Sequence, residues 1–168
     1  MNTLLEEALE AWEDARSGVV EEAENIPANE FEFRPTPDVR SVAELVVHIM
    51  EVSLMSIGEL TRDDTNLRRM PWPKMLAHYA SDVQKMRTKR ELVAALRRTL
   101  RDGLKEFRRA GEIHMLQQIL RFDGEKGTRL TWFHHAIAHE MYHRGQLATY
   151  ARLIGLKPAL TKRIEGVS

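Results

Sequence analysis

The sequence predicts an all-α protein built as an antiparallel four-helix bundle. Four segments place apolar residues at steps of three and four, which is the period of a helix with one buried face. No segment shows the alternation of a convincing strand, and the connections between the four segments are short to medium in length. At 168 residues the chain fits one domain, residues 1–168, whose core is large enough to need no disulfide.

The first helix is predicted over residues 3–25. Glutamates separate its apolar positions, so the segment is amphipathic with one face toward the core. Pro27 ends this helix, and the three prolines of residues 27–40 predict an extended loop. The residues expected on the buried face are Leu4, Ala8, Ala11, Trp12, Ala15, Val19 and Ala23.

The second helix is predicted over residues 42–60. Ser41 begins it, because Glu44 stands three positions later and completes an S-x-x-E capping box. Apolar residues cover much of the circumference, which indicates packing on more than one side. His48 lies within this helix, and a buried imidazole must find a partner or lose free energy on burial.

The third helix is predicted from Thr88 to Gly111, with a second capping box at Thr88 and Glu91. Its arginine-rich outer face is expected to lie in solvent. Residues 61–87 and 112–127 show no pattern that decides their structure, and we expect them to shape a substrate pocket. The inner face of the third helix is expected to carry Leu92, Leu96, Leu100, Leu104 and Phe107.

The fourth helix, predicted over residues 128–155, carries two histidines on its apolar face. His139 and His143 are four residues apart, so they lie one above the other with about 5–6 Å between their Cβ atoms. Two imidazoles at this spacing can bind one metal ion, and Gly155 is the expected stop. The apolar positions of this face are Trp132, Phe133, Ala136, Ile137, Leu147, Tyr150, Ala151 and Ile154.

A metal site of this kind needs a third ligand, and His48 is our candidate. Helix bundles build metal sites from side chains of facing helices in the core. His135 is an alternative, but three histidines along one straight helix spread over about 12 Å, too far for one ion. A hydrogen-bonded packing role for His48 is the structural alternative. Imidazole ligands favour Zn²⁺ or Ni²⁺ as the divalent ion.

Charge and composition exclude several classes of protein. Residues 1–66 hold 16 acids and 4 bases, whereas residues 67–168 hold 9 acids and 21 bases. We expect these halves to pack together, within one chain or between subunits, and we do not expect a nucleic-acid partner. The acidic start and the lack of a long apolar run predict no membrane segment. Because cysteine is absent, we expect a cytoplasmic protein whose chemistry, where it uses a thiol, takes that thiol from outside the chain.

The segments SVAELVVHI and, about ninety residues later, HEMYHRGQLATYARLIG resemble the DinB/YfiT-like family of bacterial four-helix-bundle metalloproteins. The resemblance implies a metal site made by His48, His139 and His143. It also implies a homodimer and a thiol-dependent S-transferase, in which a low-molecular-weight thiol attacks an electrophilic small-molecule substrate. A non-catalytic, metal-binding stress-response dimer is the alternative from another functional class.

Residues 139–143 also read H-E-x-x-H, the metalloprotease pattern in which Glu140 is the general base. The downstream extension of that motif is missing, because Thr149 stands where a further histidine is needed. A metal-dependent hydrolase with Glu140 as base remains an alternative function. Glu140 is therefore our candidate catalytic residue, with a supporting or interface role as the other interpretation.

Two arginines and one glutamate complete the candidate residues. Arg144 and Arg152 are candidates to bind an anionic group of a substrate or cofactor, although such arginines often cover apolar surface or pair with acids. Glu44 stands one turn before His48 and is a candidate to orient its ring by a hydrogen bond. Its capping-box role is the competing expectation.

Overall fold

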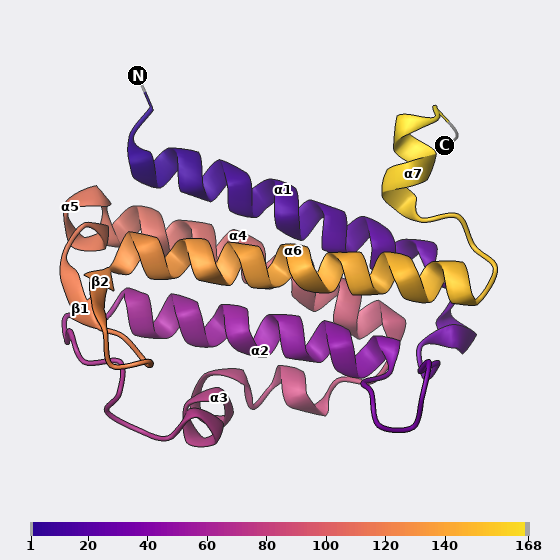
Figure 1. Cartoon of the computed structure of the whole chain (residues 1–168), viewed down its shortest axis with the longest axis horizontal. Coiled ribbons are helices and arrows are strands. Elements are labelled where there is room, and N and C mark those ends of the chain that lie inside the picture. The colour runs from indigo at the N-terminus through magenta and orange to yellow at the C-terminus, as the bar shows by residue number, and fades with distance from the viewer. Residues whose placement is uncertain (1, 167–168) are drawn as a thin grey trace.

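Four long helices form the body of the protein in the computed structural model, which describes residues 2–166. They are α1 (Leu4–Asn25), α2 (Val42–Leu60), α4 (Lys89–Ala110) and α6 (Arg129–Leu153). α1 and α2 each pack against both α4 and α6. Figure 1 shows α1 and α6 running in one direction and α2 and α4 in the other, so each helix has one parallel and one antiparallel neighbour. The predicted all-helical bundle is confirmed.

The helix ends follow the capping signals of the sequence. Ser41 and Glu44 form a complete capping box at α2, and Thr88 and Glu91 form another at α4. α4 ends at Gly111 and α6 ends before Gly155, and both glycines have a φ of +80°. That backbone conformation is unfavourable for residues with a Cβ, so each glycine terminates its helix.

The buried face predicted for α1 differs from the observed one. Leu4 is 56% exposed, whereas Leu5 and Leu9 are buried in the core. Ala11, also expected on the buried face, is exposed, so the buried stripe follows Leu5, Ala8, Leu9 and Trp12 instead. Glu112 accepts a hydrogen bond from the Leu5 backbone amide at 3.0 Å, which connects the start of α1 to α5 (Glu112–Met115).

The two ambiguous regions contain short elements, including strands that the sequence did not predict. An antiparallel hairpin of three-residue strands pairs Gln118 with Thr128, and a parallel bridge joins Leu120 to Asn66. This hairpin lies where α2 ends and α6 begins (Figure 1). The short elements of these regions are α3 (Trp72–Ala80), η2 (Val83–Lys85), α5 (Glu112–Met115), β1 (Gln118–Leu120) and β2 (Lys126–Thr128). Two further short helices lie outside them, η1 (Ala28–Glu30) and α7 (Ala159–Ile164).

The acidic first half of the chain packs on the basic second half within one molecule. Three ion pairs connect the glutamates of α1 to arginines of α4 and α7. Glu22 is buried and accepts hydrogen bonds from the first backbone amides of α7, at 2.9 and 3.2 Å. Among residues 2–166, no helix is long and apolar enough to cross a membrane. The three ion pairs are Glu6 with Arg108, Glu24 with Arg97, and Glu21 with Arg163.

Candidate metal centre

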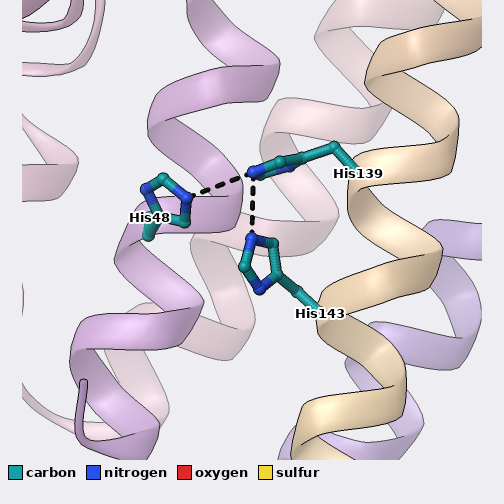
Figure 2. A group of neighbouring side chains, drawn as sticks. All are labelled: His48, His139 and His143. Carbon is teal, nitrogen blue, oxygen red and sulfur yellow. Dashed lines mark hydrogen bonds between the residues drawn. The ribbon is translucent and has the colours of Figure 1, made fainter. Parts of the chain in front are cut away.

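Three histidines from two facing helices point toward one another in the bundle. His48 comes from α2, and His139 and His143 come from α6 (Figure 2). The Nε2 atom of His139 lies 3.1 Å from Nε2 of His48 and 3.0 Å from Nε2 of His143. One nitrogen from each ring lies within 4.8 Å of the other two. The structure therefore brings together the three residues that the sequence singled out.

Burial keeps these imidazoles neutral. Loss of hydration lowers the pKa of His48 to about 4 and that of His139 to about 3, with smaller effects from Arg40 and the other histidines. Burial also lowers the pKa of His143. Because only a neutral imidazole has a lone pair for a metal, the rings are ready to bind a cation at neutral pH.

The positions of the ring protons leave an unsatisfied lone pair at the centre of the cluster. Nδ1 of His143 lies 2.6 Å from the side-chain oxygen of Gln146, and Nδ1 of His48 lies 3.7 Å from the carboxylate of Glu51. The proton of the His143 ring therefore lies on Nδ1, which leaves its Nε2 lone pair directed at His139, whereas the 3.7 Å between His48 and Glu51 is too long for a hydrogen bond. Nε2 of a neutral His139 either donates or accepts, so it cannot satisfy both His143 and His48.

A cation fits this arrangement. Nitrogens bound to one tetrahedral Zn²⁺ at about 2.0–2.1 Å lie about 3.3 Å apart, close to the observed separations. With three protein ligands, such an ion keeps a position open for water or a substrate, as in catalytic zinc sites. His48, His139 and His143 are the residues that would hold it.

The carboxylate beside His48 belongs to Glu51, which the sequence analysis did not select. Glu51 also accepts a hydrogen bond from Gln84 at 2.6 Å, so η2 helps to hold it in place. Glu44, the expected partner, instead completes the α2 capping box and bonds Arg34 at 3.1 Å. Both glutamates stand within about one turn of His48. The capping box was the sequence signal that assigned Glu44 to the helix end and left Glu51 for the ring.

Two clefts open beside the cluster, on either side of the start of α2. The larger, about 590 Å³, reaches His143 and its partner Gln146 and is also lined by Arg34 and Arg40. The smaller, about 390 Å³, lies between α2 and the η2 segment and includes Glu51 and Arg40. A small molecule can approach the histidines through the larger cleft.

Glu140 lies on a different face of α6, turned toward α1. Its carboxylate accepts hydrogen bonds from Trp12 Nε1 at 2.7 Å and from Arg16 Nε and Nη2 at 2.8 and 2.6 Å. The side chains of Arg16 and Glu140 are 0% and 2% exposed. Arg16 also donates to the backbone oxygen of Leu96 and to Thr99, so the ion pair ties α1, α4 and α6 together.

Neither of the two candidate arginines of α6 lines the larger cleft. Arg144 is buried against α1, with its guanidinium 3.8 Å from Asp14 and pressed against Gly18. Arg152 is exposed and donates to the backbone oxygen of Ala148. His135, the rejected third ligand, is exposed. The arginines that line the cleft come from the loop before α2, and charge alone gave no signal to select them.

Comparison with known proteins identifies the family and related folds. The DinB family matches residues 1–165. The fold is similar to a crystal structure of a DinB-like protein from Bacillus subtilis, with 21% identity, a TM-score of 0.67, and coverage of 89% of this chain and 92% of that one. It is also similar to the mycothiol-dependent maleylpyruvate isomerase, with 14% identity and a TM-score of 0.65. A mutant of that isomerase gives 13% identity and a TM-score of 0.68.

The match to the isomerase covers 88% of this chain but 63% of that protein, so the chain spans less than two thirds of its length. No curated protein matches the chain. The family match extends over nearly the whole sequence and includes α2 and α6, the helices that carry the three histidines. The chain therefore belongs to the DinB family.

Proposed function

We propose that this protein is a metal-dependent thiol S-transferase, in which a low-molecular-weight thiol attacks an electrophilic small molecule. The observation that carries the proposal is the convergence of three neutral imidazoles with an unsatisfied lone pair beside an open cleft. The similarity in fold to a mycothiol-dependent isomerase supports a thiol as co-substrate. The chain has no cysteine, so the sulfur comes from the co-substrate.

The chemistry divides between the bound ion and the chain. When bound, Zn²⁺ or Ni²⁺ supplies a Lewis acid that favours the thiolate form of a thiol. The chain holds the His143 ring in one tautomer through Gln146, and its cleft brings the electrophile to the sulfur. A sulfur–carbon bond forms as the bond to the leaving group breaks. The leaving group takes the electron pair, and the thiol proton passes to solvent.

The hydrolase alternative requires Glu140 to act as a general base. Both of its oxygens accept hydrogen bonds from Trp12 or Arg16, which supports a structural role over proton abstraction. A non-catalytic metal protein would need a closed coordination sphere, whereas the cleft of about 590 Å³ reaches His143. These observations favour the transferase.

The test begins with untagged protein purified without a metal-affinity column. Elemental analysis gives its metal content, and 1-chloro-2,4-dinitrobenzene with a panel of thiols tests transfer. We expect activity that disappears on chelation and returns with Zn²⁺ or Ni²⁺, and a His139→Gln variant that neither binds metal nor reacts. His135→Gln is the matched control, because that exposed residue lies on the same helix. Full transferase activity in the metal-free protein contradicts the proposal.

The family resemblance also supports a homodimer in the cytoplasm as part of the proposal. The outer face of α6 exposes Met141, Tyr142 and Leu153 at 45%, 66% and 58%. An apolar surface of this kind is a common feature of subunit contacts. Light scattering in solution tests the assembly, and a monomer across the micromolar range contradicts it.

A further inference from the structure

Arg40 is an exposed arginine in the cleft that reaches His143. Arg40 lines both clefts beside the cluster, and His143 lines the larger of them. Among the ion pairs and side-chain hydrogen bonds of residues 2–166, none uses the Arg40 guanidinium. An arginine in a concave surface with its donors free is suited to bind an anion, because its planar group matches a carboxylate.

The backbone around Arg40 is fixed, so its side chain starts from a defined point. Tyr150 donates its hydroxyl hydrogen to the Arg40 backbone oxygen at 3.1 Å, which ties the loop to α6. Arg34 donates to the backbone oxygen of Val39 at 3.2 Å. Ser41 follows as the N-cap of α2. Little backbone ordering is therefore needed when an anion binds.

The acids of the larger cleft are already partnered. Glu44 accepts hydrogen bonds from Arg34 at 3.1 Å and from the Ser41 amide at 2.9 Å. Asp38 accepts one from Thr36 at 2.6 Å. Both carboxylates thus already have hydrogen-bond donors, whereas the Arg40 guanidinium has no hydrogen-bond or ion-pair partner among residues 2–166.

We propose that Arg40 is the anion-recognition residue of this cleft, and that it binds a carboxylate carried by the thiol or the electrophile. This inference rests on the proposed function, because it names the class of molecule that enters the same site. A single carboxylate fits better than a phosphate. The two acids at the rim repel a dianion, and one free guanidinium offers one planar pair of donors.

The first experiment uses metal-free protein, so that it does not depend on the metal. Propionate and its neutral isostere propionamide are titrated while the side-chain Nε–H signals of the arginines are followed by NMR. We expect propionate to shift the Arg40 signal saturably, and propionamide to leave it unchanged. Arg98→Gln, an exposed residue of α4, is the control that retains propionate binding, whereas Arg40→Gln loses it. Equal responses to the two ligands, or unchanged binding in Arg40→Gln, overturns the inference.

The second experiment separates this inference from the proposed function. Cobalt-loaded protein is titrated with 3-mercaptopropionate and with neutral 2-mercaptoethanol, and the sulfur-to-cobalt absorption band is measured. We expect about tenfold tighter binding of the carboxylate-bearing thiol, and loss of that preference in Arg40→Gln with the 2-mercaptoethanol affinity unchanged. Absence of the band with both thiols contradicts the proposed function, while the propionate result still decides the role of Arg40. Equal affinities for the two thiols contradict the inference alone.

Discussion

Replacing Glu140 by glutamine tests whether this residue of the H-E-x-x-H sequence serves stability or chemistry. The substitution removes the negative charge of a buried ion pair and nearly preserves its shape. In the parent protein, N–H donors of Trp12 and Arg16 contact the two carboxylate oxygens. Glutamine instead directs an amide NH₂ group at some of these donors. The guanidinium of Arg16 then stays buried without a counter-charge.

The expected loss of stability is large. Removing one partner of a buried ion pair costs about 3–5 kcal/mol, because the remaining charge is not compensated. With a urea m-value of about 2 kcal/mol/M, the unfolding midpoint falls by about 1.5–2.5 M. Glu10→Gln, an exposed position on α1, is expected to change the free energy of unfolding by less than about 0.5 kcal/mol.

The assay is urea denaturation followed by circular dichroism, with transferase activity measured at low temperature, where the variant remains folded. The structural role predicts a lower midpoint and, at saturating metal, activity within about tenfold of the parent protein, since general-base removal typically costs about 10²–10⁴-fold. An unchanged midpoint together with loss of activity refutes the reasoning and restores Glu140 as a base.

Three further predictions follow from the site and the core. The free energy of unfolding of the metal-free protein falls as the pH drops from 6.5 towards 3. The reason is that His139 takes up a proton in the unfolded chain, whereas the folded ring, with a pKa of about 3, does not. Urea titrations at each pH measure this profile, and we expect a flatter one for His139→Gln. Gln146→Leu lowers metal affinity about 10- to 100-fold by removing the acceptor for the His143 ring, as measured by competition with a chelating dye, and unchanged affinity contradicts this role. Gly103→Ala destabilises the protein by about 1–3 kcal/mol, because the added Cβ lies 2.5 Å from the Trp12 ring. Gly145→Ala, whose Cβ meets nothing within 4 Å, stabilises the protein by about 0.5–1 kcal/mol. Equal thermal shifts for the two variants contradict the packing argument.

The helices and the histidine cluster were predictable because their signals are local. The capping boxes at Ser41 and Thr88 fixed where α2 and α4 begin, and the four-residue spacing of His139 and His143 placed both rings on one face. The β1–β2 hairpin was not predictable, because strands of three residues are too short to show an alternating pattern. Backbone bonds between Leu120 and residues 65–67 help to hold it, and these are visible only in the fold.

The surroundings of the histidines depended on tertiary structure in the same way. Glu44 and Glu51 both stand within about a turn of His48. Only Glu51 faces its ring, because Glu44 is held in the capping box of α2. Arg40 lies in a loop, where no periodicity assigns a direction to a side chain. It reaches the site because Tyr150 of α6 binds its backbone oxygen. Sequence spacing therefore predicted the histidine cluster better than it predicted the residues around it.

The two faces of α6 explain why a costly buried ion pair stands beside the candidate metal centre. Successive helical residues differ by about 100° around the axis, so His139 faces α2 while Glu140 faces Arg16 of α1. We infer that the ion pair sets the rotation of α6 and thereby aims the histidines. A double variant, Arg16→Met with Glu140→Met, tests this, because it removes the buried charge and so recovers part of the stability that Glu140→Gln loses, although Trp12 Nε1 then lacks its acceptor. If the ion pair aims the rings, metal affinity stays reduced although stability returns. Recovery of both shows that packing alone sets the rotation.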